Sequence, residues 1–552
     1  MRVIALFGRG NVGKTHCLGH LINLMHQEVY GHGYLIEGHD ECVTFEYHGQ
    51  RITICTWGDT SEDEQKNLDY ISCQAPDIAI VATRTKGNTV ELVRQYSERN
   101  GCSLKWVEKY VANPEDASEQ EYMNHLQARQ ILEYIRDVIE GHLYYVDCIS
   151  AIDGEGKRYH VALFGTEMTD DGFPRSLSIE LNENQMHYFA SEQRIEEDDF
   201  VWYHPDSNHM MRFASDAPRA NELRRESQTL RRELIKLEMN GNGAWAISQR
   251  KTDWVKSYHV KVGHGNCSLI LIKYEIGYDL WMVDCSTYDY LIRCDYSLNL
   301  LYCLKCIAEE VGVDVKNLHV SRFMLTHTHF DHYNGLRYLM NHGVVDGKTL
   351  VYANLHYDCS SVVWCDVLKK LKGLSCRFVE PISDNLRQGV IRILHPECRL
   401  YKNSESVEDG VKNRVVANAN DASVVYGITL LGKMMTLPGD LETVGFKEMS
   451  GHAPCQGNLS LTHYYVVSHH GSLNGHPDVM CMSKGAPNPK PLTCVSQNVK
   501  KAILMGRNGA YRGIYSQRVI DYWGNAMGVL EYTENALHYL VLDWENDKVV
   551  MG

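Results

Sequence analysis

The sequence has no hydrophobic run long enough to span a membrane. A transmembrane helix needs roughly 18 or more consecutive apolar residues, and no such run occurs among the 552 residues. Near the N-terminus, the apolar run at residues 3–7 is short and glycine-rich loop chemistry follows at once, which argues against a signal peptide. We therefore expect a cytoplasmic protein that does not use a membrane.

Cysteine is plentiful, but it lacks the spacing of a structural framework. The 18 cysteines are scattered along the chain, which indicates reduced thiols, as in a cytoplasm. The one CxxC pair, Cys303 and Cys306, lies in a helical-looking segment without a second pair, which argues against a zinc ribbon. Two half-buried cysteines on one helix face is the interpretation that fits this pair.

Positively charged residues are fewer than negatively charged ones. Lysine and arginine number 55 against 70 aspartates and glutamates, which gives a net charge of −15. This balance does not favour a protein whose whole surface binds nucleic acid, although a local basic groove is compatible with it. The hydrophobic fraction of 44% is ordinary for a globular protein, and the length predicts two or more domains.

The densest group of metal-binding side chains is the sequence THTHFDH at residues 326–332. An apolar run before it indicates the end of a buried strand. A strand that stops at a tight loop can aim His327 and His329 at one cation, while Asp331 and His332 face a second cation or the water on the first. The alternative is a histidine-rich surface loop.

This HxHxDH pattern resembles the signature of the metallo-β-lactamase fold. Its flanks resemble the branch that contains the hydrolase domain of the DNA-uptake protein ComEC. Residues 259–270 are similar to the "DVGxGDxxLI" opening of that branch, with Asn266 where the family usually has Asp. Asp284 ends what looks like the family's next strand. From the residues alone, it can orient a ligand histidine or simply belong to a turn.

Three later motifs extend the resemblance. Residues 418–425 are similar to the family's NxxSLV strand, but the third-motif histidine of many such hydrolases is missing there. We therefore expect a first metal site with fewer protein ligands, or only one tightly bound metal. Asp440, in a Gly-Asp pair after an apolar strand, takes the family's metal-bridging role. His469 and His470 follow another strand, in the sequence HHGS.

One histidine of that pair is implied as a metal ligand, and the other as a proton donor or phosphate-binding group. His469 is favoured as the ligand because it comes first after the strand, which leaves His470 as a catalytic residue. The resemblance covers roughly residues 255–530 and implies an αββα sandwich with the site at one edge. One or two divalent metals, zinc or manganese, are expected there, with Asp331 also orienting the attacking hydroxide. The implied ligands are His327, His329, Asp331, His332, Asp440 and His469.

The N-terminal residues fit the phosphate-binding pattern GxxxxGK[ST]. An apolar, β-rich run precedes the pattern and a helical pattern follows it, which is the context of a P-loop. Its backbone N–H groups would wrap a phosphate chain at a helix N-terminus. Lys14 would reach the β- and γ-phosphates, and the Thr15 hydroxyl would ligate Mg²⁺. The predicted nucleotide-binding residues are Gly8, Gly10, Asn11, Val12, Gly13, Lys14 and Thr15.

Asp59 is the candidate for a second Mg²⁺ contact. It follows a predicted hairpin at residues 43–56 and resembles a Walker B aspartate, although a turn or helix-cap role fits about as well. The layout resembles the small GTPase-like P-loop proteins. However, the guanine-binding NKxD pattern is missing at residues 82–88 and DxxG is missing at residues 57–60. ATP therefore fits the sequence at least as well as GTP.

Between the two halves the sequence carries little signal. Residues 146–217 show strand-like stretches and no motif, which predicts a small β-rich linker module. Residues 218–239 form one charged helical pattern, suited to packing or to association with a second copy or a protein partner. Its leucines share one stripe: Leu223, Leu230, Leu234 and Leu237. The Asn-Gly-Asn-Gly at residues 240–243 predicts a hinge.

Together these patterns predict an α/β protein. Its parts are a P-loop three-layer α/β/α domain at 1–145, the β-rich module at 146–217, the linker helix and hinge at 218–243, and a metallo-β-lactamase αββα sandwich at 250–552. We expect the last domain to hydrolyse a phosphodiester, most simply as a nuclease. Binding or hydrolysis of ATP or GTP with Mg²⁺ in the first domain would control it, as in a defence or stress effector.

Two alternatives stay open from the sequence. One is a hydrolase of a small molecule, such as a lactone, a thioester or a cyclic nucleotide, which the acidic net charge suits. The other is a nucleotide-dependent switch whose metal domain binds without catalysing.

Overall fold

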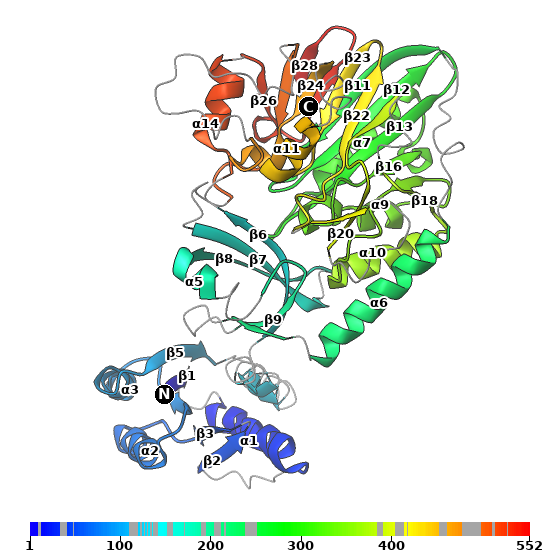
Figure 1. Ribbon diagram of the computed structural model, residues 1–552. Helices are drawn as coiled ribbons and strands as arrows, with labels where there is room; N and C mark the ends of the chain where they lie inside the picture. Colours follow the sequence, from blue (N-terminus) through cyan, green and yellow to red (C-terminus); the bar gives the residue numbers. More distant parts are fainter. Residues whose placement is uncertain are drawn as a thin grey trace. The chain divides into compact units, whose positions relative to one another are not determined.

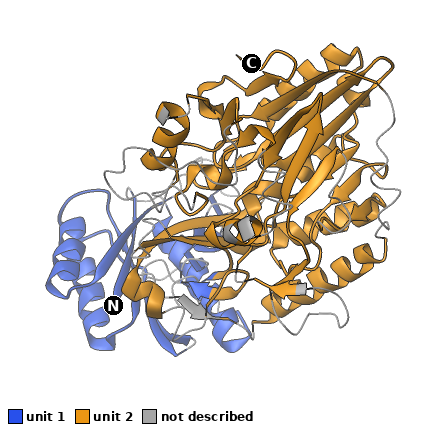
Figure 2. Cartoon of the chain, turned by 45° about the horizontal axis from the view of Figure 1, so that its top comes forward, with its two compact units in different colours: residues 1–142, 202–210 blue, residues 143–201, 211–552 orange. Residues whose placement is uncertain are grey.

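The computed structural model of the chain forms two compact units (Figure 2). Unit 1 is residues 1–142 with 202–210, and unit 2 is residues 143–201 with 211–552. Among the described residues, no helix is both long enough and apolar enough to cross a membrane. The structure describes residues 1–8, 13–33, 41–47, 49–109, 120–121, 124–125, 127–129, 131–132, 135, 142–151, 158–169, 172–188, 195–203, 211–214, 217–237, 251–382, 390–402, 413–416, 418–451, 461–476, 498–510, 514–526 and 528–552. The predicted P-loop residues Gly10, Asn11 and Val12 and the predicted hinge at 240–243 lie outside this set.

Unit 1 is a five-stranded sheet between two layers of helices (Figure 1). The strand order is β2-β3-β4-β1-β5. All neighbours are parallel except β2 and β3, which form the predicted hairpin and confirm it. The strands are β1 (Arg2–Phe7), β2 (Cys42–Tyr47), β3 (Gln50–Cys55), β4 (Ile78–Thr83) and β5 (Ser103–Glu108), and the helices are α1 (Lys14–Tyr30), α2 (Ser61–Gln74) and α3 (Asn88–Arg99).

The alternation of side chains along β1 separates the two helix layers of unit 1. Successive residues of a strand point to opposite faces of the sheet. Ile4 and Leu6 therefore pack in one core with the apolar face of α1, whereas Val3 and Ala5 pack in another with α2 and α3. Helix α1 thus lies on the face of the sheet that carries Ile4 and Leu6.

Unit 2 contains two sheets packed face to face. The larger has the order β18-β17-β16-β13-β12-β11-β27-β28, and the smaller has the order β19-β22-β23-β24-β25-β26. One apolar core fills the space between them, in which Trp281 and Val283 of the larger sheet meet Tyr426, Met435 and Tyr464 of the smaller. The larger sheet comprises β11 (Thr252–Val260), β12 (Cys267–Tyr274), β13 (Tyr278–Cys285), β16 (Arg322–Met324), β17 (Leu350–Tyr352), β18 (Arg377–Val379), β27 (Tyr539–Asp543) and β28 (Lys548–Met551). The smaller comprises β19 (Ile391–His395), β22 (Val425–Leu430), β23 (Lys433–Leu437), β24 (Thr462–Val466), β25 (Lys501–Leu504) and β26 (Leu530–Tyr532).

Helices cover the outer faces of both sheets. Helix α7 (Ser297–Val311) packs on β11 and β27 of the larger sheet. On the smaller sheet, α11 (Thr443–Gly451) packs through Phe446 against Leu394 and Val425. The order of layers is therefore helix, sheet, sheet, helix, and the mixture of helices and sheets confirms the predicted α/β class.

A third sheet in unit 2, named the middle sheet here, is built by the weakly patterned residues between the halves. Its order is β10-β9-β6-β7-β8. The strands are β6 (His142–Ala151), β7 (Arg158–Met168), β8 (Pro174–Asn182), β9 (Phe200–Tyr203) and β10 (Met211–Phe213). Ring stacking of Phe164 on Phe330, with centroids 4.4 Å apart, joins the middle sheet to the THTHFDH loop. Residues 143–201 thus fold against the predicted hydrolase half.

Helix α6 (Pro218–Ile235) uses most of its leucine stripe inside unit 2. Leu223, Leu230 and Leu234 are buried and the helix packs against α10 (Val362–Gly373), whereas Leu237 is 46% exposed. Arg231 of α6 forms an ion pair with Asp358. These three leucines therefore pack against other parts of the same chain.

Candidate metal centre

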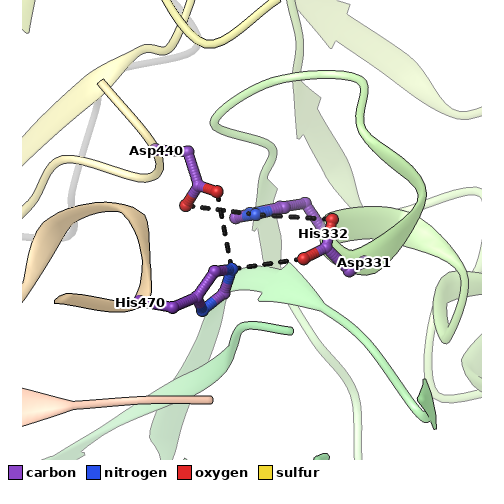
Figure 3. Close-up of side chains that lie close together, drawn as sticks. All are labelled: Asp331, His332, Asp440 and His470. Atoms are coloured by element: carbon purple, nitrogen blue, oxygen red, sulfur yellow. Dashed lines mark hydrogen bonds and ion pairs between the residues drawn. The ribbon is translucent and has the colours of Figure 1, made fainter. Parts of the chain in front are cut away.

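Four side chains with metal-binding groups lie close together on the segments that follow three strands of the two packed sheets (Figure 3). Asp331 and His332 come after β16, Asp440 after β23, and His470 after β24. Strands β23 and β24 are parallel, so the loops after them leave the sheet at the same edge. One ligand-type atom from each side chain lies within 4.8 Å of the others, and all four residues are buried.

The distances within this cluster are those of direct polar contacts. Nε2 of His332 lies 3.3 Å from Oδ1 of Asp440. Nε2 of His470 lies 3.2 Å from Oδ2 of Asp331 and 3.4 Å from Oδ2 of Asp440. His264 joins the group, with its Nε2 3.3 Å from Oδ2 of Asp331. Imidazoles and carboxylates at this spacing form a donor set that suits zinc or a similar divalent ion.

Burial and charge oppose each other in the cluster. Burial alone would lower the pKa of His470, but the carboxylates of Asp440 and Asp331 outweigh it and raise that pKa to about 9. Burial alone would raise the pKa of Asp440, but His470 and His332 hold it well below its usual range. Protonated imidazoles therefore balance the carboxylates when no cation is bound. A divalent cation supplies the same positive charge and leaves the imidazoles neutral, as ligands must be.

Several ligand-type atoms in and beside the cluster are not satisfied by hydrogen bonds, which also fits a bound cation. Within the described part of the chain, Nε2 of His327 is buried and makes no hydrogen bond, and Nε2 of His332 and Oδ1 of Asp440 meet at 3.3 Å without the geometry of a hydrogen bond. Buried polar atoms are normally satisfied, since an unsatisfied one costs free energy. A metal ion among these residues would satisfy them.

Asp284 orients one of the histidines. Its Oδ2 lies 2.8 Å from Nδ1 of His332, and its Oδ1 accepts a hydrogen bond of 2.8 Å from the backbone N–H of Thr326. Because Nδ1 donates its hydrogen to this carboxylate, Nε2 of His332 faces Asp440 with a lone pair that a metal ion can use. This contact is the orienting role considered for Asp284 from the sequence.

The backbone on either side of the cluster determines which side chains enter it. Gly439 has φ of 59°, and a Cβ there would lie 2.5 Å from Cβ of Thr326, so glycine is required beside Asp440. His469 and His470 both have φ of 47°, in the left-handed region that non-glycine residues rarely adopt. This turn brings His470 into the cluster. His469 lies further out, with Nε2 3.9 Å from Oδ2 of Asp440. The geometry thus favours His470 over His469 as the ligand.

His327 and His329 lie beside the cluster rather than inside it. The His327 ring centroid is 4.1 Å from that of His332 and 4.6 Å from that of His329. Residues 143–201, which include most of the middle sheet, are called the middle-sheet region here. Nε2 of His329 is directed to Glu197 of this region, 3.5 Å from its Oε2. All six residues predicted as ligands are therefore within one buried region, but His329 has a carboxylate partner that the sequence does not predict.

Several residues of this region were missed from the sequence. His264 lies within residues 259–270, the stretch similar to "DVGxGDxxLI", so its imidazole beside two glycines could have been predicted as part of the site. Asp147, Cys148 and Glu197 carried no such signal, because they belong to the motif-free residues 146–217. Asp147 accepts a hydrogen bond of 3.1 Å from the backbone N–H of Phe330, and burial raises its pKa to about 7.

In unit 1 the described residues of the predicted P-loop lie near Asp59 at the end of β1. Gly8 follows β1, and Gly13, with φ of 82°, precedes α1. The Lys14 ammonium lies 3.4 Å from the carbonyl oxygen of Gly8 and 3.3 Å from Oδ1 of Asp59. Thr15 occupies the first turn of α1. The lysine and the aspartate that the sequence assigned to phosphate and Mg²⁺ therefore face each other.

No protein-family model and no curated protein matches this chain. Among solved structures, a crystal structure of the metallo-beta-lactamase GOB-18 from Elizabethkingia meningoseptica is similar at 14% sequence identity. The similarity covers 53% of this chain and 95% of that one, with a TM-score of 0.20. A likeness of this size carries no argument by itself, so the case for a hydrolase depends on the site residues.

Proposed function

We propose that unit 2 is a metal-dependent hydrolase of the metallo-β-lactamase type that cleaves a phosphodiester, most simply as a nuclease. The buried cluster of Asp331, His332, Asp440 and His470 supports this most, because it offers ligand-type atoms in an arrangement suited to a cation. These residues would hold one or two zinc or manganese ions, with His327 and His329 beside them. A bound cation of this kind lowers the pKa of water and stabilises charge on a phosphoryl oxygen.

The protein groups in this proposal orient the reactants. Asp331, whose Oδ2 faces both His264 and His470, is the carboxylate that positions the attacking water. His469, at the margin of the cluster, would bind the phosphate of the leaving group as a neutral imidazole, because burial lowers its pKa to about 4. This exchanges the roles that the sequence gave to His469 and His470.

We also propose that unit 1 binds ATP or GTP with Mg²⁺ and that this binding controls the hydrolase. The contact between Lys14 and Asp59 at the end of β1 and the GxxxxGK[ST] sequence support nucleotide binding. A role as a nucleotide-switched defence or stress effector would follow from such control.

One observation favours a small substrate as the second candidate. The side chains of the cluster are almost completely covered, at 6% exposure for Asp331, 0% for His332, 3% for Asp440 and 1% for His470. A nucleic acid could reach them only after displacement of the covering chain. A lactone, a thioester or a cyclic nucleotide needs a smaller opening.

The experiment that tests the function compares substrate classes with one purified protein. Metal-stripped full-length chain is reloaded with Zn²⁺ or Mn²⁺ and offered labelled DNA, labelled RNA, cyclic nucleotides and small esters, with and without ATP or GTP. The variants are Asp331→Ala with His332→Ala, and His342→Ala as a matched control, because His342 is an exposed histidine in the same segment.

Cleavage of DNA or RNA that the double variant loses and the control keeps would support the nuclease. Cleavage of only the small substrates would replace it with the second candidate. Metal-loaded protein that cleaves nothing, with or without nucleotide, would overturn the hydrolase and leave a non-catalytic metal domain.

A further inference from the structure

A second group of metal-binding side chains lies where the middle-sheet region meets the THTHFDH loop. Cys148 is in β6, Glu197 precedes β9, and His329 is in the loop after β16. One ligand-type atom from each of the three lies within 4.8 Å of the others. All three are buried, at 8%, 4% and 3% exposure. Thiol, carboxylate and imidazole thus meet in a place that water reaches poorly.

The carboxylate of Glu197 is held in a fixed orientation. Its Oε1 accepts a hydrogen bond of 2.8 Å from the backbone N–H of Ile149, and its Oε2 accepts one of 3.1 Å from the N–H of Ala419. A carboxylate oxygen has two lone pairs, so each oxygen keeps one for another partner. The backbone therefore aims Glu197 towards His329 without exhausting its capacity to bind a cation.

The contact with Ala419 locates Glu197 relative to the sequence motifs. Ala419 belongs to residues 418–425, the stretch that resembles the family's third motif but lacks its histidine. The carboxylate of Glu197 is bonded to the backbone of this stretch. The middle-sheet region thus brings an anionic oxygen to a segment whose own side chains supply no histidine.

We propose that Cys148, Glu197 and His329 form a second cation site, separate from the cluster of Asp331, His332, Asp440 and His470. A thiolate with an imidazole and a carboxylate selects zinc or a similarly soft divalent ion over magnesium or calcium. Three protein ligands leave one position open for a fourth donor. The middle-sheet region supplies two of the three ligands, so the site exists only when that region is folded against the loop.

This inference rests on the proposed metal-dependent function and deepens it. The loop would carry one cation on His329 and another on Asp331 and His332, which places two cations along a single short segment. The competing state is a plain ion pair between His329 and Glu197, at the observed 3.5 Å, with a protonated Cys148 beside it.

Metal content and a cobalt spectrum separate these two states. Metal-stripped full-length protein is loaded with Zn²⁺ for measurement of bound metal, and with Co²⁺ for absorption spectroscopy. We expect the wild type to bind one equivalent of zinc more than either site variant does, and to show a near-ultraviolet charge-transfer band from thiolate to cobalt. Cys148→Ser should abolish the band, and Cys148→Ser and Glu197→Gln should each remove one equivalent.

The controls match each variant in type. Cys294→Ser changes a partly buried cysteine elsewhere in unit 2, and Glu196→Gln changes the exposed neighbour of Glu197; both should keep the metal content and the band. Should the serine variant fail to fold, protection of wild-type Cys148 from alkylation by bound zinc, mapped by mass spectrometry, gives the same information.

The inference is overturned if cobalt-loaded wild type shows no thiolate band, or if zinc leaves Cys148 as reactive as in the metal-free protein. Hydrolysis that continues in such a protein would show that only this inference has failed. Conversely, a thiolate band in protein that hydrolyses nothing would support the second site and overturn the proposed function.

Discussion

Oδ2 of Asp284 lies 2.8 Å from Nδ1 of His332, and both side chains are fully buried. The same oxygen accepts a hydrogen bond of 2.8 Å from the Thr326 hydroxyl. The backbone of Asp284 is left-handed, with φ of 55°, a conformation that Asp and Asn tolerate better than most residues. This carboxylate therefore fixes the ring that presents its other nitrogen to Asp440.

Replacing Asp284 with Asn should weaken metal binding without unfolding the protein. Asn keeps the size and tolerates the backbone conformation, but it removes the charge that stabilises His332 as a ligand. Loss of such an orienting partner typically costs roughly 10- to 100-fold in metal affinity. Competition with a chelator measures the change. Asp279→Asn, on the same strand but outside the cluster, is the control, and equal affinities in the two variants would contradict the orienting role.

The two adjacent histidines should differ in their effect on metal. His470→Ala removes an imidazole that contacts both Asp331 and Asp440, whereas His469→Ala removes one whose closest approach to Asp440 is 3.9 Å. We expect His470→Ala to lower the affinity for zinc at the cluster of Asp331, His332, Asp440 and His470 by at least roughly tenfold. His469→Ala should mainly slow turnover. Calorimetric titration of metal-stripped protein distinguishes them, and the opposite order would restore His469 as the ligand.

Stability of unit 1 should depend on pH through one buried acid. Burial raises the pKa of Glu64 to about 9 from its ordinary value of 4.5. Between these values the folded chain holds a proton on Glu64 that the unfolded chain has released, so the folded state binds more protons and stability falls as pH rises. From pH 6 to pH 8 the loss approaches about 3 kcal/mol, because each pH unit in this window costs about 1.4 kcal/mol at most.

Glu64→Gln mimics the protonated side chain and should remove this dependence. Its gain in melting temperature over wild type is expected to be larger at pH 8 than at pH 6 in thermal unfolding. Glu62→Gln, at an exposed position of the same helix, should give no such difference. A gain for Glu64→Gln that does not grow with pH would mean that Glu64 is ionised in the folded protein.

Nucleotide binding should depend on Lys14. Its ammonium lies between the Gly8 carbonyl and Asp59, which also contacts Arg84 at 3.3 Å. Lys14→Ala should reduce the affinity for fluorescent ATP and GTP analogues by more than roughly tenfold, because the charge on the phosphates loses its main partner. Lys66→Ala, on the surface of α2, should leave the affinity unchanged. Binding that both variants retain would exclude a P-loop role for Lys14.

Local patterns in the sequence sufficed for residues that follow strand ends. Asp440 and the histidines of residues 326–332 were found because an apolar run, a glycine or a tight loop, and a metal-binding side chain are neighbours in sequence. The hairpin of unit 1 was found for the same reason. Contacts between residues that are close in sequence produce a pattern that the sequence itself shows.

Contacts between distant segments left no such pattern. Glu197 and His329 are separated by more than a hundred residues, and they meet only because the middle sheet folds against the THTHFDH loop. Which of His469 and His470 enters the cluster depends on left-handed backbone angles, which their position after the strand does not reveal. The leucine stripe of α6 could be predicted from the sequence, but the packing of α10 against it could not.

The chain passes between the two units after residue 142, after residue 201 and after residue 210. The first crossing lies at the start of β6, the strand that carries Asp147 and Cys148, and the second follows Glu197 by a few residues. The covalent links between the units therefore lie within a few residues of Cys148 and Glu197.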